Sequence, residues 1–225
     1  MQKENENVST GQRINEFIQK NRKSIFISVG AVILVIVGTI ITLSLIEVFD
    51  KKAISGAEEL NSRYEEVHHR ISEETSAEEV QTLLADLNAF AKKNSGFAAG
   101  RAWSIIGHIH SDRKEWPEAE TAWQSAAKAA SKTYLGPVAL FNAAVCAEEQ
   151  EKYPQAIDLY SQSVSHKVIF PAAPHAQFAI GRLNETLNDR AGAIEAYRNV
   201  LARWPNVTVW TNLAQSRIIA LDTGE

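Results

Sequence analysis

The sequence predicts an all-α protein in which a single N-terminal transmembrane helix precedes an α-solenoid of helical hairpins. Two observations predict this class: residues 25–46 carry no charged side chain, and three later segments ending in Ala-x-x-x-aromatic recur every 37 residues. The predicted divisions are a cytoplasmic tail (1–24), a transmembrane helix (25–46), a stalk and helical hairpin (47–95), three repeats (97–206) and a C-terminal capping helix (207–225).

The composition excludes some classes of protein. The chain has 225 residues and a formal net charge of −4, whereas a nucleic-acid-binding protein needs a basic surface that neutralises phosphates. Its one cysteine, Cys146, cannot form an internal disulfide. A lone cysteine is compatible with reducing and oxidising compartments, so it leaves the compartment open.

The segment before the transmembrane helix is amphipathic. Ile14, Phe17 and Ile18 share one face at helical spacing. The basic residues around that face are Arg13, Lys20, Arg22 and Lys23. Two interpretations stay open: a juxtamembrane helix that rests on an anionic leaflet, or a solvated segment that leads into the membrane span.

Residues 25–46 are long enough to cross a membrane, because a helix of this length spans roughly 33 Å and a bilayer core is about 30 Å thick. The run exceeds a signal-peptide core and ends without an Ala-x-Ala-like site, which predicts an uncleaved signal anchor. Basic residues near its two ends favour a cytoplasmic N-terminus by one charge. Gly30, Gly38 and Thr42 form a stripe that either admits another membrane helix or reflects ordinary glycine usage.

A helical hairpin is expected after the membrane segment. Apolar residues recur at threes and fours from residue 54 to residue 71, so the membrane helix is expected to continue as a stalk. Ser76 and Glu79 form a capping-box pattern for a helix over residues 77–93. The apolar face of that helix contains Val80, Leu83, Leu84, Leu87, Phe90 and Ala91.

The repeated segments are residues 114–123, 151–160 and 188–197. In each, an alanine follows a small residue of the preceding helix by twelve positions, and the pairs are Gly107/Ala119, Ala144/Ala156 and Gly181/Ala193. Antiparallel helices cross closely only where both present small side chains, so this spacing predicts three hairpins. The large residues expected to pack around these pairs include Trp103, Trp123, Tyr160 and Tyr197.

These residues resemble the tetratricopeptide repeat, whose pattern is Trp-x-x-Leu-Gly-x-x-Tyr, then Ala-x-x-x-Phe, then Pro. Trp103, Gly107 and Trp123 match it in the first unit, whereas Ala144 replaces the glycine in the middle unit. The period of 37 residues exceeds the family's usual period of about 34. Since the interval inside each unit is constant, the extra residues are expected between units. A last helix over residues 208–221 is expected to cap the array, with Trp210, Leu213, Ala214, Ile218 and Leu221 on one face.

The resemblance implies that the first helices of the repeats form a concave surface that binds a peptide or a folded protein. The lining residues that it implies are Ser104, His108, Ser111, Phe141, Val145, Glu148, Phe178, Arg182 and Glu185. For any one of them, packing against the terminal helix is an alternative role. The family's Lys/Asn clamp for C-terminal carboxylates is not reproduced, which disfavours chaperone-tail binding.

No catalytic residue, cofactor or metal site is predicted. Phosphate-binding loops, Gly-x-Gly-x-x-Gly, His-Glu-x-x-His and Gly-x-Ser-x-Gly are absent from the sequence. The pairs His68/His69 and His108/His110 cannot chelate a metal alone, because residues one or two apart on a helix point in different directions. Cys146 is interpreted as a small buried hydrophobe.

The order of the parts resembles the YfgM-type ancillary subunits of the SecYEG translocon. The resemblance rests on Glu4-Asn5-Glu6-Asn7, on Phe17, Asn21 and Lys23, and on the span, hairpin and repeats that follow. It implies a non-enzymatic protein of the bacterial inner membrane, with periplasmic repeats that assist newly exported polypeptides beside translocon subunits and a membrane-anchored chaperone. Alternatives are a scaffold for cell-wall or outer-membrane assembly, a cytosol-facing receptor on an organelle and, far below these, an enzyme that recruits substrate through the repeats.

Overall fold

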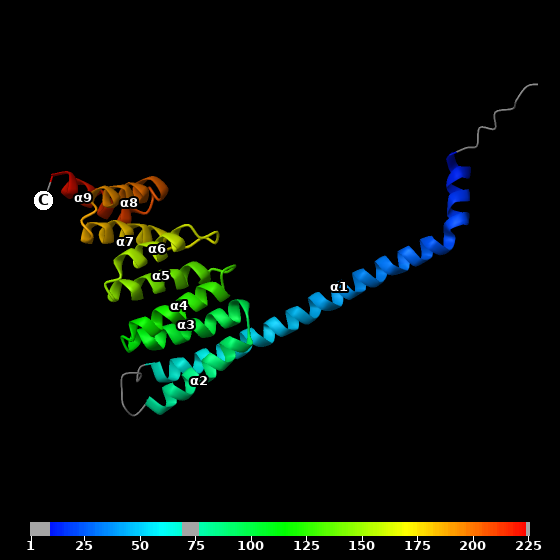
Figure 1. Ribbon diagram of the computed structural model, residues 1–225, viewed down its shortest axis with the longest axis horizontal. Helices are drawn as coiled ribbons and strands as arrows, with labels where there is room; N and C mark the ends of the chain where they lie inside the picture. The colour runs from blue at the N-terminus through cyan, green and yellow to red at the C-terminus, as the bar shows by residue number, and fades with distance from the viewer. Residues whose placement is uncertain (1–9, 69–76, 224–225) are drawn as a thin grey trace, which may run out of the picture. The chain divides into compact units, whose positions relative to one another are not determined.

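The computed structural model describes residues 10–68 and 77–223, and within these ranges every regular element is an α-helix (Figure 1). The helices are α1 (Thr10–His68), α2 (Ala77–Lys93), α3 (Gly96–Asp112), α4 (Trp116–Ala129), α5 (Leu135–Glu149), α6 (Tyr153–Val164), α7 (Ala173–Thr186), α8 (Arg190–Arg203) and α9 (Thr208–Thr223). The predicted all-α class is confirmed. The predicted N-cap Ser76, His69 and residues 4–7 lie outside the described ranges.

Contacts divide the chain into two units, residues 1–51 and 52–225, and α1 crosses their boundary. In the first unit, the apolar side chains of α1 are open to the surroundings, as at Phe26 (75% exposed) and Leu34 (74% exposed). Within the described ranges, α1 is the one helix that is long and apolar enough to cross a membrane, judged by length and composition. This finding fits a single-pass membrane anchor.

In the second unit, helices α2 to α9 stack in chain order as antiparallel hairpins (Figure 1). The connections within hairpins are short and cover residues 113–115, 150–152 and 187–189. The connections between hairpins are longer and cover residues 130–134 and 165–172. The expectation that the extra residues of the 37-residue period lie between units is therefore confirmed.

The three hairpin turns share one backbone conformation. Lys114, Glu151 and Asn188 have φ values of 59°, 58° and 60°. Each of them donates its N–H to a carbonyl three residues earlier, and the next residue donates to a carbonyl five residues earlier, as in the bond from the Glu115 N–H to the His110 oxygen (2.9 Å). This pair of bonds is the Schellman motif, which ends a helix with a left-handed residue.

Apolar residues of successive helices form the core of the solenoid. The first cluster joins the end of α1 to α2 and α3 and includes Leu60, Val80, Leu83, Leu87, Ile105 and Ile109. The central cluster runs from α4 to α8 and consists mainly of alanines around Trp123, Leu159, Tyr160 and Leu183. The last cluster joins α8 to α9 through Tyr197, Val200, Ala214 and Ile218. Because alanine dominates the centre, the helices there approach closely.

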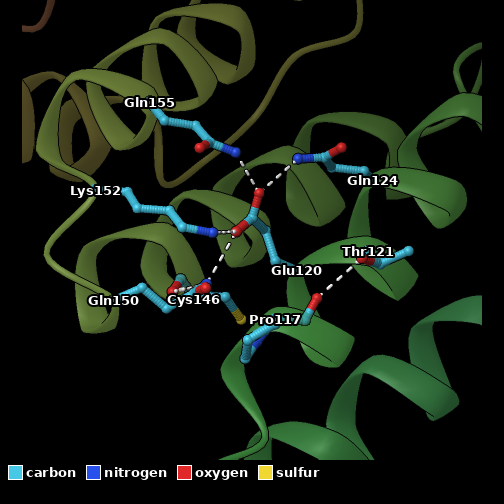
Figure 2. A network of polar contacts seen from close by, with 8 residues as sticks. All are labelled: Pro117, Glu120, Thr121, Gln124, Cys146, Gln150, Lys152 and Gln155. Atoms are coloured by element: carbon cyan, nitrogen blue, oxygen red, sulfur yellow. Dashed lines mark hydrogen bonds and ion pairs between the residues drawn. The ribbon is translucent and has the colours of Figure 1, made fainter.

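A buried carboxylate joins the first two repeats (Figure 2). Glu120 on α4 is 6% exposed. It accepts hydrogen bonds from the side-chain amides of Gln124 (2.8 Å), Gln150 (2.9 Å) and Gln155, and the Lys152 ammonium lies 3.6 Å away. These partners come from α4, from the α5–α6 turn and from α6. The network therefore fixes the second hairpin against the first through polar contacts. The rest of the central core packs mainly through alanine side chains.

Candidate partner-binding face

The predicted packing residues lie at the crossings of the hairpin helices. Gly107, Ala119, Trp123, Ala144, Ala156, Tyr160, Gly181, Ala193 and Tyr197 are buried, and Trp103 is half-buried. A Cβ atom on Gly107 would lie 2.7 Å from the Trp123 ring, and one on Gly181 would lie closer still to the Tyr197 ring. The first and third crossings therefore leave no room for a methyl group.

The aromatic residue that ends each repeat also makes a polar contact with the first helix of its hairpin. The Trp123 indole N–H donates to the Ser111 hydroxyl (3.4 Å), and the Tyr160 hydroxyl donates to Glu148 (3.3 Å). The Tyr197 hydroxyl donates to Glu185. Burial and the neighbouring carboxylates raise the pKa of both tyrosines, so both phenols stay protonated donors. The sequence analysis missed this link, although its constant spacing of twelve residues was a readable signal.

The prediction that Ser104 lines the binding surface is wrong. Ser104 is 2% exposed, and its hydroxyl donates to the Gly100 carbonyl of its own helix (2.9 Å). The side chain is short and bonds to its own backbone, so it lies beneath its neighbours and cannot contact a partner. The other implied residues keep some exposure, and we call them the first-helix face: His108, Ser111, Phe141, Val145, Glu148, Phe178, Arg182 and Glu185.

The charges of the first-helix face are paired between the second and third repeats and between the third repeat and the capping helix. Arg182 on α7 lies 2.6 Å from Glu148 on α5. Arg217 on α9 forms a two-point ion pair with Glu185 on α7. Partial burial raises the pKa of Glu185, but hydrogen bonds from Arg217 and Tyr197 outweigh this effect and hold the pKa below its ordinary value. A protein that binds this face would therefore contact carboxylates whose charge is already balanced by an arginine.

Aromatic rings continue along the same helices. His175 on α7 stacks on Trp210 of α9 (4.4 Å between centroids, planes at 10°) and lies 5.1 Å from Phe141 of α5. Partial burial of His175 against these rings lowers its pKa, which favours the neutral form of the imidazole. Phe178 also contacts Trp210, with ring centroids 5.5 Å apart. The sequence analysis assigned Trp210 to the capping helix alone, and His175 carried no spacing signal.

The capping helix differs from its prediction at one residue. Ala214 and Ile218 are buried against α8, and Trp210 and Leu221 are partly covered. Leu213 is 44% exposed and does not belong to this face. Since α9 packs mainly against α8, a narrower stripe than the predicted one is enough to bury its apolar side.

Titratable groups near this face are held in structural contacts. Tyr64 of α1 donates to Asp112 of α3 (3.3 Å), and His110 bonds to Glu115 (2.5 Å). Partial burial lowers the pKa of His108, whose ring packs edge-on against Trp123. Over residues 10–68 and 77–223 no three His, Cys, Asp or Glu side chains gather in a way that could hold a metal ion.

Cys146 is buried against the Ser111 hydroxyl, and burial raises the pKa of its thiol to about 11. A thiol with this pKa is protonated at neutral pH and is a poor nucleophile. This environment agrees with the interpretation of Cys146 as a buried hydrophobe.

Fold and face together define a solenoid of helical hairpins whose first helices present paired charges and aromatic rings. A family model for the tetratricopeptide repeat matches residues 106–176 and again residues 148–208. The chain is 38% identical over 144 residues to a TPR repeat-containing protein of Treponema pallidum (strain Nichols), and the match covers 63% of this chain and 59% of that relative. The chain therefore contains tetratricopeptide repeats, and it spans less than two thirds of that relative's length.

Proposed function

We propose that this chain is a non-enzymatic, membrane-anchored scaffold that binds a protein through the first-helix face. The observation that carries the proposal is the union, in one chain, of tetratricopeptide repeats with a candidate membrane helix. Repeats of this kind mediate contacts between proteins. An anchor raises the local concentration of such a surface beside a membrane complex, which strengthens binding without new contacts.

The chemistry of the face supports binding over catalysis. Glu148 and Glu185 are neutralised by arginines, and His108 and His175 have lowered pKa values and contact aromatic rings. Such groups offer apolar and polar contact area to a polypeptide. They do not converge on one point where a reacting atom would lie.

The more specific proposal is an ancillary role beside the protein-export translocon. In it, residues 25–46 span the bacterial inner membrane, residues 1–24 are cytoplasmic, and the hairpin (47–95), repeats (97–206) and capping helix (207–225) are periplasmic. The order of these parts supports it, through their resemblance to YfgM-type subunits. Partners would be translocon subunits, a membrane-anchored chaperone or exported polypeptides.

Affinity purification of the full chain in mild detergent tests the partner. We expect translocon subunits to co-purify, and we expect His108→Glu on the exposed part of the first-helix face to reduce their recovery. Ser161→Glu, on the exposed side of α6, is the matched control and should leave recovery unchanged. Reproducible recovery of a cell-wall or outer-membrane assembly complex without translocon subunits would refute the translocon role and favour the alternative scaffold.

Protease added to spheroplasts tests the orientation separately. The repeats should be digested if they face the periplasm. Protection of the repeats in sealed spheroplasts, with digestion after lysis, would contradict a periplasmic domain.

A further inference from the structure

The first turns of α1 carry an amphipathic surface that the binding function does not use. Ile14, Phe17 and Ile18 are 55%, 64% and 48% exposed. At about 100° per residue they lie on one side of the helix. Asn21 lies on the same side, and its amide donates to the Phe17 carbonyl (2.9 Å), which satisfies that polar group locally.

Charges are arranged around this apolar side in a way that suits an anionic surface. Arg13 and Lys20 border one edge of it and Arg22 borders the other, whereas Glu16 and Lys23 lie on the opposite side of the helix. In the ranges that the structure describes, Arg13, Lys20 and Arg22 have no acidic partner. Cations that flank an apolar face let the face enter the headgroup region while the cations meet phosphates.

We propose that residues 10–24 lie in the membrane interface and bind anionic phospholipid headgroups. This inference rests on the proposed membrane anchor, because the same helix continues into the apolar run and holds these residues at the bilayer surface. Two observations favour lipid over a protein partner. The basic side chains complement anionic headgroups, and α1 continues directly from this segment into the apolar run. The protein would then contact the bilayer in two ways: through the transmembrane span, and through a contact of residues 10–24 that depends on anionic lipid.

The test uses the full chain with Cys146→Ala, so that a single introduced cysteine carries a spin label. Labels at Phe17→Cys (apolar side), Gln19→Cys (polar side) and Val37→Cys (membrane span) report access to a water-soluble nickel chelate. The protein is reconstituted into phosphatidylcholine vesicles with or without phosphatidylglycerol. The Val37 label tests the anchor, and the Phe17 label tests the surface contact.

We expect phosphatidylglycerol to reduce nickel access at Phe17 by about fivefold or more, the factor that one basic residue contributes near an anionic surface. The Gln19 label should change less. Raising ionic strength from about 0.1 M to about 1 M, which shortens the Debye length from about 10 Å to about 3 Å, should reverse much of the protection.

Replacing Arg13, Lys20 and Arg22 with glutamine should abolish the effect of phosphatidylglycerol. Replacing Lys51 and Lys52 with glutamine, beyond the other end of the apolar run, is the matched control and should preserve it. Equal access at Phe17 in both lipids, with Val37 in lipid, would overturn the surface contact alone. A water-exposed Val37 label would overturn the anchor and the inference together.

Discussion

At the scale of single residues, contacts between a helical glycine and an aromatic ring set the closest approach of the helices. Gly107 faces Trp123 and Gly181 faces Tyr197, and both rings are almost completely buried. The pairing was predictable because a small residue and an aromatic residue recur at fixed intervals. The burial of Ser104 was not predictable, since the equivalent positions in the other two units are held by larger residues, Phe141 and Phe178, which are only partly buried.

Gly181→Ala should destabilise the protein by about 1–2 kcal/mol, although this change in a helix normally stabilises by nearly 1 kcal/mol. The new methyl group would overlap the Tyr197 ring, whose hydroxyl is held by Glu185 and which has no space to move. Urea unfolding in mild detergent measures the change. A more stable Gly181→Ala variant would show that the crossing is looser than described.

Glu151→Gly should stabilise the protein by about 1 kcal/mol, because glutamate pays a steric penalty at positive φ that glycine does not. Asn188→Gly is the matched control at the equivalent turn and should gain less, since asparagine tolerates this conformation. Thermal unfolding compares the two variants. Equal gains at both turns would contradict this assignment of strain.

At the scale of elements, junctions between helices depend on contacts between residues far apart in sequence. Glu120 binds Gln150 and Gln155, which are 30 and 35 positions away. A residue pattern cannot reveal such a network, because each glutamine alone is typical of a solvated helix face. The equivalent positions in the next two repeats are Ile157 and Ile194, so the polar junction is particular to the first two repeats.

Glu120→Gln should cost about 1–3 kcal/mol, because the NH2 group that replaces one carboxylate oxygen would face two donors. These donors are either the amides of Gln124 and Gln155 or the Gln150 amide with the Lys152 ammonium, and the charge pair with Lys152 is lost in both cases. Glu120→Ile should be close to neutral, since isoleucine fills this position in the other repeats. The exposed Gln124 and Gln155 amides can turn to water, and the Gln150 amide keeps its bond to the Cys146 carbonyl. Urea unfolding distinguishes the two variants. A larger loss for Glu120→Ile than for Glu120→Gln would contradict this account of the junction.

The ion pair between α7 and α9 should make stability depend on acid pH. Because the pKa of Glu185 is lowered in the folded protein, the unfolded chain takes up this proton first as pH falls. The stabilisation that ionised Glu185 contributes is therefore complete above about pH 5. It is lost as the pH falls through the lowered pKa of Glu185. Arg217→Gln should flatten this acid loss, measured as the free energy of unfolding against pH.

Arg190→Gln is the control for that measurement. It removes an ion pair to Asp222 of α9 whose members are both more than half exposed, and such pairs contribute little. An acid profile that Arg217→Gln leaves unchanged would show that Glu185 does not control it.

At the scale of the whole molecule, the sequence was sufficient to predict a membrane helix followed by hairpin repeats. An uncharged run of sufficient length and a 37-residue period are properties of the chain itself. The pairing of Glu148 with Arg182 and the stack of His175 on Trp210 depend on how one repeat rests on the next, and these contacts determine the chemistry of the first-helix face. The proposed scaffold function belongs to this scale, because it needs both the anchor and the face.

Site-specific photo-cross-linking in intact membranes tests that central proposal most directly. A photoreactive amino acid is placed at His108 or Val145 on the first-helix face, and at Ser161 or Arg198 on the exposed sides of α6 and α8 as controls. We predict protein adducts from His108 and Val145 and none from Ser161 and Arg198. Adducts that form only at Ser161 and Arg198, or equally at all four positions, would contradict a partner-binding first-helix face.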